Sequence, residues 1–301
     1  MRELAFLCAA VLLAACDRDG GAKTEFSGER AMEYIRTQLQ FGPRIPGSLG
    51  HQRTGDWIVD QMRQRADTVI VQSWSHVTQA GDTLPLRNIL ARHNPAASER
   101  ILYLAHWDTR PVADQAPQPS RRQLPVPGAN DGGSGVALLM ALADVLKAAP
   151  PEIGVDLLFV DGEDYGEFDR AKRHDVLIGS TYFAAHLPSP DYRPLYGVLW
   201  DMIGDGDLQL YQEGYSVERA PEVVSLVWET ARRLGYSRYF IPQVGQAVAD
   251  DHLPLLDAGL RVIDVIDIQY PAHHTPDDLI DKVSARSLQV VGDVAVSLIR
   301  R

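Results

Sequence analysis

The acidic stretch VDGEDYGE follows the apolar run GVDLLFV and contains four carboxylates, those of Asp161, Glu163, Asp164 and Glu167. Carboxylates at this density repel one another and are costly to desolvate unless a cation or a bound proton offsets their charge. Adjacent acids can also take separate roles, with one side chain binding a metal while its neighbour transfers a proton. The stretch therefore predicts a metal site with a general base, or a solvated loop if no other ligands accompany it.

Four further residues of metal-binding types lie in short motifs elsewhere: His106 in HWD, Asp131 in GANDGGSG, Asp201 in DMIGD and His274 in HHTPDD. Taken alone, each has an ordinary structural explanation, as a surface histidine, a helix N-cap or a turn former. Taken together, imidazoles and carboxylates are a ligand set that Zn²⁺ accepts, with a position left open for a substrate. The sequence predicts a zinc site if the fold brings these motifs to one place.

The elements that must position these residues alternate between strand-like and helical patterns. Apolar runs typical of strands occur at TVIVQSW, RNILARH, RILYLAH, GVDLLFV, LYGVLWDM and RVIDVIDI. Helical patterns include HQRTGDWIVDQMRQR, SGVALLMALADVLKAA, IGSTYFAAHL, PEVVSLVWETARRLG and SARSLQVVGDVAVSLIRR. This alternation predicts an α/β fold, a three-layer α/β/α sandwich with a largely parallel mixed central sheet. In such a sheet functional groups collect beyond the carboxyl ends of the strands, where most of the motifs above lie.

Length and composition limit the class of protein. A chain of 301 residues with 45% hydrophobic content can bury a full core, and neither an internal repeat nor a shift in composition marks a second domain. The formal net charge of −11 argues against a nucleic-acid partner. A bound metal or a small cationic substrate suits such a charge better.

The N-terminal segment MRELAFLCAAVLLAAC has an apolar part that is too short to span a bilayer as a permanent helix. It is typical of a secretory signal, and LLAAC resembles a bacterial lipobox, which implies a lipid on Cys16. We expect a signal peptide at 1–15, a lipoprotein tether at 16–27 and a single catalytic domain at 28–301. The chain would then be exported to the periplasmic side of the cell envelope, with an N-terminal lipid as its only membrane contact. The alternative is an ordinary cleaved signal with Cys16 unmodified.

The motifs HWD, GANDGGSG, DGED, LWDMIGD and HTPDD, in this order, resemble those of the zinc-dependent M28 peptidases and of the glutaminyl cyclases that share their fold. Within this clan, FGPRIPGS, AHWDTRPVADQ, GEDYG and DDHLPLLDAG are more similar to bacterial glutaminyl-peptide cyclotransferases. Asp250 in DDH separates the two groups, because aminopeptidases of the clan usually have Ser-Asp-His there. The resemblance therefore favours a cyclase that converts the N-terminal Gln of peptides to pyroglutamate and releases ammonia.

The resemblance implies a role for each matching position. In a cyclase, one zinc is held by Asp131, Asp164 and His274. Glu163 acts beside the zinc as the general base, and the acids Asp201 and Asp250 support it. In an aminopeptidase, two zincs are held, Asp131 bridges them, and His106 and Asp201 are added as ligands. The ligand positions of both arrangements are filled in this sequence, so they leave the metal count open.

One further possibility follows from the same motifs. A non-catalytic envelope lipoprotein could keep the fold and only bind peptides, but such a protein would be expected to have lost Glu163 or some ligands.

The residue before the zinc histidine is Trp in the cyclases, whereas this chain has His273, and Val112 likewise stands where bacterial relatives tend to have Trp. The match to HTPDD assigns the ligand role to His274 and leaves His273 as a wall of the pocket or a bystander.

Overall fold

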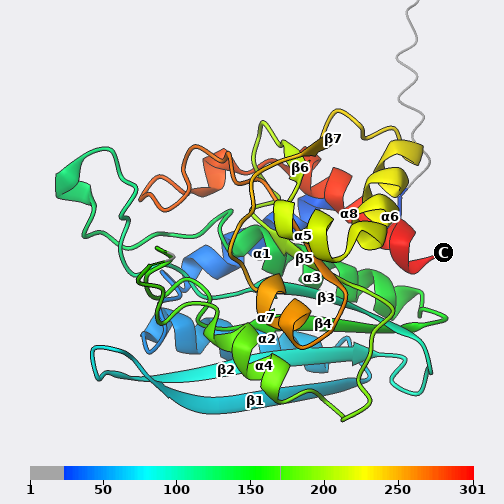
Figure 1. Cartoon of the computed structure of the whole chain (residues 1–301), viewed down its shortest axis with the longest axis horizontal. Helices are drawn as coiled ribbons and strands as arrows, with labels where there is room; N and C mark the ends of the chain where they lie inside the picture. The colour runs from blue at the N-terminus through cyan, green and yellow to red at the C-terminus, as the bar shows by residue number, and fades with distance from the viewer. Residues whose placement is uncertain (1–23, 170) are drawn as a thin grey trace, which may run out of the picture.

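A mixed six-stranded sheet forms the centre of the molecule (Figure 1). The computed structural model describes residues 24–169 and 171–301. The strands of the central sheet, in their spatial order, are β1 (Thr68–Val77), β2 (Thr83–His93), β4 (Gly154–Val160), β3 (Arg100–His106), β5 (Gly197–Asp201) and β8 (Val262–Ile266). Strand β2 runs antiparallel to β1 and to β4, whereas β4, β3, β5 and β8 are mutually parallel. The carboxyl ends of these four strands therefore lie at one edge of the sheet.

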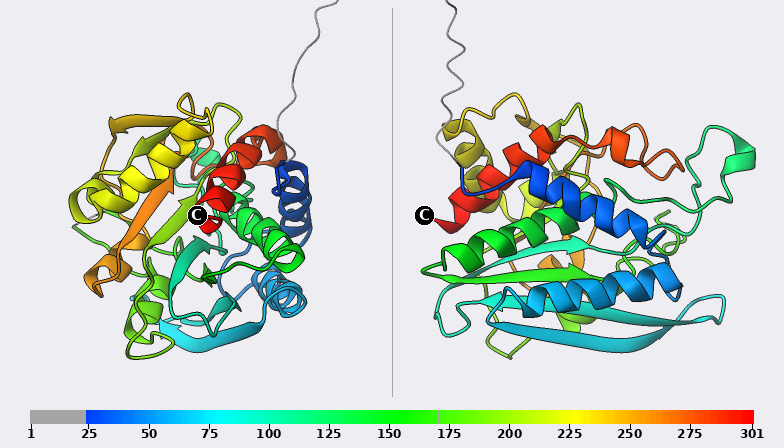
Figure 2. Two further views of the ribbon diagram at one scale, coloured as in Figure 1. Left: turned by 90° about the vertical axis from the view of Figure 1, so that its right-hand side faces the viewer. Right: turned by 180° about the vertical axis from the view of Figure 1, so that it is seen from behind.

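Helices cover both faces of this sheet (Figure 2). One face carries α1 (Gly28–Gln40), α2 (Leu49–Arg63), α3 (Gly133–Ala148), α6 (Pro221–Arg233) and α8 (Ala285–Ile299), and the other carries α4 (Ile178–Ala185) and α7 (His252–Asp257). The remaining elements are short: α5 (Gly214–Arg219), the 3₁₀ turns η1 (Pro119–Arg121) and η2 (Ile280–Lys282), and a two-stranded sheet of β6 (Leu210–Gln212) and β7 (Phe240–Val244).

The apolar pattern of each strand explains its place in the sheet. Every residue of β3, β4, β5 and β8 is buried, as expected for parallel strands that are covered on both faces. Strand β1 instead alternates between exposed and half-buried residues over most of its length, which suits an edge strand. Two cores result, one beneath the five-helix face and one beneath α4 and α7, where Phe183 and Leu255 pack against the sheet.

The predicted α/β/α sandwich with a largely parallel sheet is confirmed. Each of the six expected strands is present, although β1 and β2 extend beyond the expected runs to form a long hairpin. The pair β6–β7 and the helices α5 and α7 were not predicted. These elements are three to six residues long, too short for a periodic pattern, so packing against the larger elements decides them.

The expected signal peptide and Cys16 lie outside the described residues. The last residues of the expected tether pack on the domain, because Phe26 is buried against α8 at Gly292 and Glu25 pairs with Arg300 at 2.8 Å. The packed domain therefore begins before residue 28. Among residues 24–301 except 170, no helix is long and apolar enough to span a bilayer.

Candidate metal centre

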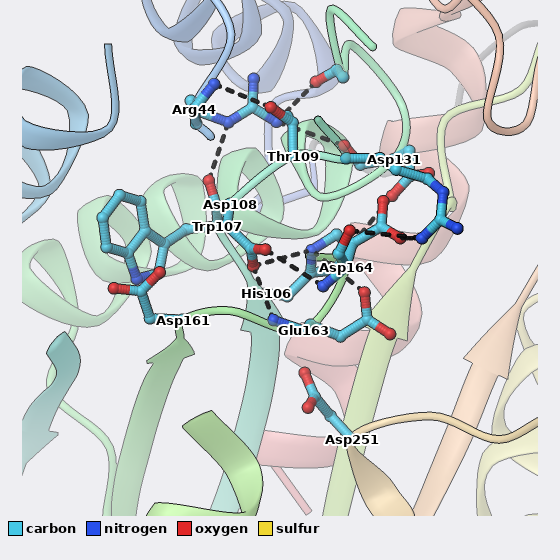
Figure 3. Close-up of polar contacts among 12 residues, drawn as sticks. Arg44, His106, Trp107, Asp108, Thr109, Asp131, Asp161, Glu163, Asp164 and Asp251 are labelled. Atoms are coloured by element: carbon cyan, nitrogen blue, oxygen red, sulfur yellow. Dashed lines mark hydrogen bonds and ion pairs between the residues drawn. The ribbon is translucent and has the colours of Figure 1, made fainter. Parts of the chain in front are cut away.

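The ends of three parallel strands and the loop before α3 bring five of the predicted residues to one edge of the sheet. His106 is the last residue of β3 and Asp201 the last of β5, while Glu163 and Asp164 follow β4 after a tight turn. Asp131 comes from the loop that leads into α3. Figure 3 shows the side chains of His106, Asp131, Glu163 and Asp164 directed toward one another from these separate segments.

His106 lies between two of the carboxylates. Its Nε2 is 3.1 Å from Asp131 Oδ1 and 3.2 Å from Asp201 Oδ1, and its Nδ1 is 3.8 Å from Glu163 Oε2. All four side chains are buried. One donor atom from each of His106, Asp131 and Asp201 lies within 4.8 Å of the other two, a spacing that a single metal ion can bridge.

His274 brings the second imidazole to the same carboxylates. Its Nε2 is 3.2 Å from Asp164 Oδ1 and 3.7 Å from Asp131 Oδ2. A second donor cluster, again within 4.8 Å, consists of Asp131, His273 and His274. Asp164 therefore contacts His274 but does not belong to either cluster, whereas His273, expected as a pocket wall, belongs to one.

Two acids outside the expected site fix the backbone of the acidic loops. The carboxylate of Asp108 accepts hydrogen bonds from the N–H groups of Glu163 and Asp164 at 3.0 and 3.1 Å. The carboxylate of Asp278 does the same for Asn130 and Asp131 at 2.9 and 3.1 Å. Both pairs of loop residues are held in place independently of any side-chain ligation.

Arg44, from the motif FGPRIPGS, joins the loops that carry His106 and Asp131. It is fully buried, and its guanidinium donates to the carbonyl of Trp107 at 2.8 Å (Figure 3) and to that of Gly128 at 2.8 Å. Gly128 has a φ of +72°, in the left-handed region that glycine adopts without strain. The spacing of the candidate catalytic and metal-binding residues does not predict an arginine that supports the backbone in this way.

Arg110 and Asp114 lie beside the ligand candidates and were not assigned a role from the sequence. Arg110 donates to Asp164 Oδ1 at 2.9 Å and to Asp114 Oδ1 at 2.6 Å. Asp114 in turn lies 3.5 Å from Nδ1 of His274, and Gln115 Nε2 lies 3.3 Å from the same atom. Partners of this kind orient metal-binding histidines and carboxylates in other proteins. The stretch TRPVADQ within the motif AHWDTRPVADQ contains all three, so the resemblance was the only available signal.

Asp161, the first acid of VDGEDYGE, lies away from this centre. Its carboxylate is 2.8 Å from His51 Nε2 and accepts a hydrogen bond from the N–H of Arg87 at 2.8 Å. The four acids of the stretch are therefore not equivalent, and only Glu163 and Asp164 join the metal-ligand candidates.

Burial makes Glu163 a strong proton acceptor. It raises the pKa of Glu163 well above its usual range, and the charges of Asp164 and Asp250 raise it further, while His106 opposes them. Burial and the charge of Asp201 raise the pKa of Asp250 in the same direction. The buried acids of the centre therefore hold a proton more readily than exposed carboxylates do.

His274 and Asp131 lie in an environment that favours their charged forms. Burial alone would lower the pKa of His274, but Asp164 and Asp114 outweigh it and raise that pKa to about 10. Burial alone would raise the pKa of Asp131, but His106 and His274 outweigh it and hold that pKa well below its usual range. Asp131 is thus an anion that attracts a cation.

The donor set fits zinc. Imidazole nitrogens and carboxylate oxygens are both ligands that zinc accepts. Asp131 Oδ2 and Asp164 Oδ2 are buried and lack a hydrogen-bond partner in the described part of the chain, although buried carboxylate oxygens are normally paired. A cleft opens over these donors, and its walls include Glu163, Asp201, Asp250, His273 and His274, with Phe168 and Tyr215 beyond them.

Comparison with known proteins agrees with this site. The model of Peptidase family M28 matches residues 88–299. The chain is 26% identical over 297 residues to Aminopeptidase YwaD of Bacillus subtilis (strain 168), an alignment that covers 91% of this chain and 57% of that protein. The chain thus spans little more than half the length of this curated relative.

Two solved structures have the same fold. The glutaminyl cyclase of Porphyromonas gingivalis superposes with a TM-score of 0.87 at 36% identity and covers 91% of this chain and 98% of its own. A Zn-dependent exopeptidase of Parabacteroides distasonis ATCC 8503 has a TM-score of 0.87 at 32% identity and covers 92% and 99%. These matches confirm the resemblance predicted from the motifs, and with the family match they show that this chain belongs to peptidase family M28.

Proposed function

We propose that this chain is a zinc-dependent glutaminyl-peptide cyclotransferase, which converts the N-terminal glutamine of peptides or proteins to pyroglutamate and releases ammonia. The observation that carries this proposal is the buried acid Asp250, which lines the same cleft as Glu163 and raises its pKa. This is the position at which the motifs separate cyclases from aminopeptidases. The similarity to the Porphyromonas gingivalis cyclase over nearly its whole length supports the proposal.

The pattern of paired and unpaired oxygens supports a single zinc. On one side of the centre, Asp131 Oδ1 and Asp201 Oδ1 both lie near Nε2 of His106, at 3.1 and 3.2 Å. On the other side, Asp131 Oδ2 and Asp164 Oδ2 lack a hydrogen-bond partner in the described part of the chain, and both residues contact His274 Nε2, through Asp131 Oδ2 at 3.7 Å and Asp164 Oδ1 at 3.2 Å. We therefore assign one zinc to Asp131, Asp164 and His274, and leave His106 and Asp201 as a hydrogen-bonded pair.

The reaction needs a proton carrier more than a new nucleophile. A bound zinc would supply Lewis acidity toward the γ-carboxamide of the substrate. Glu163 takes a proton from the α-amine as its nitrogen bonds to the carboxamide carbon, and returns the proton to the nitrogen that leaves as ammonia. Burial and the charge of Asp250 raise the pKa of Glu163, and Asp201 raises the pKa of Asp250 in turn, which helps the carboxyl of Glu163 to keep this proton. The nucleophile is part of the substrate. A bound conformation of the substrate that places its α-amine against its own carboxamide can therefore provide an effective molarity on the order of 10⁵ M.

A di-zinc aminopeptidase is the second candidate, and one observation favours it. His106, Asp131 and Asp201 form a donor cluster of their own, to which a second zinc could bind. In that case Glu163 would act on a water molecule rather than on an amine. The relatives named above include proteins described as an aminopeptidase and as an exopeptidase.

One assay separates these functions. The purified chain is incubated with a Gln-initiated peptide and, separately, with Leu-p-nitroanilide, while ammonia, pyroglutamate and nitroaniline are followed. We expect pyroglutamate and ammonia without nitroaniline, and one zinc per chain by elemental analysis. Nitroaniline without pyroglutamate, together with two zincs, would refute the cyclase proposal in favour of the peptidase. If neither product formed in a chain loaded with zinc, the non-catalytic peptide binder would be favoured.

The variant Glu163→Gln tests the proton carrier. The amide cannot accept a proton, so we expect turnover to fall by at least about 10²-fold, the scale of general acid–base catalysis, with zinc content unchanged. The control is Glu167→Gln, which changes an acid of the same loop at the cleft wall and should keep most activity. Loss of zinc from Glu163→Gln would instead show that Glu163 is the ligand and Asp164 the base.

Export, the signal peptide at residues 1–15 and lipid attachment at Cys16 stay predictions from the sequence. Mass spectrometry of the mature N-terminus, from cells that express the whole chain, would test them together.

A further inference from the structure

We propose that His273 is an additional ligand of the metal, so that this chain holds its zinc with two neighbouring imidazoles. The inference rests on the zinc site of the proposed function and extends it, because the resemblance assigns only His274 to the metal. It concerns the one position of the motif, HHTPDD in place of a Trp-His pair, at which the chain departs from the cyclases.

The donor geometry carries the proposal. One ligand atom each from Asp131, His273 and His274 lies within 4.8 Å of the other two. The rings of His273 and His274 lie with their centroids 3.9 Å apart at an interplanar angle of 49°. Both side chains line the cleft. A tryptophan at this position would offer no nitrogen lone pair, so the substitution changes the chemistry of the wall as well as its shape.

The backbone at this point has an unusual conformation that brings the two rings together. Successive side chains of an extended chain point to opposite sides, which would separate neighbouring imidazoles. His274 instead has a φ of +52°, in the left-handed region that residues other than glycine seldom occupy. Such strain persists only where the surroundings require it, and it concentrates at ligand sites.

The ring nitrogens of His273 are free for a metal. In the described part of the chain, neither forms a hydrogen bond or an ion pair, whereas Nε2 of His274 is 3.2 Å from Asp164 and Nε2 of His106 is 3.2 Å from Asp201. Asp131, in the same donor cluster, has a buried Oδ2 without a hydrogen-bond partner in the described part of the chain. An imidazole with free ring nitrogens, in a donor cluster with Asp131, can complete a ligand set without adding negative charge.

This ligand has a consequence for substrate binding. Asp131, Asp164 and His274 leave a fourth zinc position open, and His273 fills it in the resting protein. A substrate carboxamide would therefore compete with His273 for the metal, and removal of the imidazole would lower the affinity for zinc while opening the position.

The test compares metal binding in the whole chain and in single variants. Zinc dissociation constants are measured by competition with a chelator, and the visible spectrum of the Co²⁺-loaded protein reports the number and type of ligands. We expect His273→Phe to weaken zinc binding at least tenfold, since even loss of groups that only orient ligands costs about 10–100-fold. The Co²⁺ bands should also change in position and intensity.

Controls separate ligation from packing. His186→Phe removes an exposed imidazole that stacks on Tyr182 outside the site, and it should leave both readouts unchanged. His274→Phe should weaken zinc binding at least as much as His273→Phe. Added imidazole should restore the Co²⁺ spectrum of His273→Gly, because free imidazole can enter the space of the missing ring. His273→Trp keeps a large ring without a ligand atom and should behave as His273→Phe.

The outcomes also separate this inference from the proposed function. Unchanged zinc affinity and an unchanged Co²⁺ spectrum in His273→Phe and His273→Trp, beside a clear loss in His274→Phe, would overturn the inference and leave the cyclase proposal standing. A wild-type chain that binds zinc through His273 but forms no pyroglutamate would refute the cyclase and leave the inference standing. A wild-type chain without affinity for zinc would overturn both.

Discussion

His93, at the end of β2, illustrates how one buried side chain can set the response of this protein to acid. The residue is buried, and its Nε2 has no hydrogen-bond partner in the described part of the chain. Burial lowers its pKa from 6.5 to about 4, although Asp67 and Asp156 act in the opposite direction. Between these two pH values the unfolded chain binds a proton that the folded chain does not. The contribution to stability is therefore complete above pH 6.5 and is lost as the pH falls toward 4.

The variant His93→Leu tests this pH dependence of stability. Between pH 7 and pH 4, the free energy of unfolding of the wild type should fall by on the order of 2–3 kcal/mol more than that of His93→Leu. Urea titrations at several pH values provide the comparison. Buried acids whose pKa is raised, such as Asp267 at about 7, act with the opposite sign but are common to both proteins and cancel in the difference. Parallel pH profiles for the two proteins would contradict the prediction.

At the scale of elements, the contact between the first described residues and α8 is a tight fit. Gly292 lies in the middle of α8, and a Cβ at this position would overlap the ring of Phe26. Alanine favours a helix over glycine by about 1 kcal/mol, so a substitution there would help if space allowed. Because of the steric conflict, we expect alanine at this position to destabilise the protein instead.

We expect Gly292→Ala to destabilise the protein by about 1–3 kcal/mol, the usual effect of overpacking. In a Phe26→Ala background the same change should be neutral or stabilising, because the ring that it meets is gone. Denaturant unfolding of the wild type, both single variants and the double variant completes the cycle. Equal effects of Gly292→Ala in both backgrounds would show that Phe26 does not pack there.

The long elements and the edge of the sheet that carries the site were predictable because they depend on local pattern. Predominantly apolar runs such as RILYLAH and GVDLLFV identify buried parallel strands, and the candidate site residues that follow them must then share one edge. The short elements α5, α7, β6 and β7 had no such pattern. The roles of Arg110 and Asp114 could not be predicted for another reason. Arg110 contacts Asp164, which lies 54 residues later in the chain, and the spacing of residues in the sequence does not indicate such a contact. The left-handed turn at His274, which sets the place of His273, was equally invisible.

At the scale of the whole molecule, the buried acids couple metal binding to stability. The centre concentrates the carboxylates of Asp131, Glu163, Asp164 and Asp201 in the protein interior. A bound cation offsets their repulsion only in the folded state, so it must stabilise that state. The metal therefore belongs to the stability of this protein as well as to its proposed chemistry.

Removal of the metal should consequently lower the melting temperature. Zinc at about 100 times its dissociation constant contributes about 2.7 kcal/mol, which is several degrees for a domain of this size. Calorimetry before and after treatment with a chelator measures the shift, and added zinc should reverse it. The variant Asp131→Asn, which removes one of the charges that the cation offsets, should show a smaller shift. A chain that binds zinc but melts at one temperature with and without chelator would contradict this coupling.

The pairing of Glu25 with Arg300 also fixes where the first described residues lie relative to the cleft. Arg300 donates to the carbonyl of Ala149 at 2.7 Å, just beyond the last residue of α3. Helix α3 begins two residues after Asp131 and has 16 residues, so its far end is about 24 Å from the metal centre. The chain thus enters the domain at the end opposite the cleft. A fusion partner, an affinity tag or a solid support joined ahead of Thr24 would face away from the opening and leave it accessible.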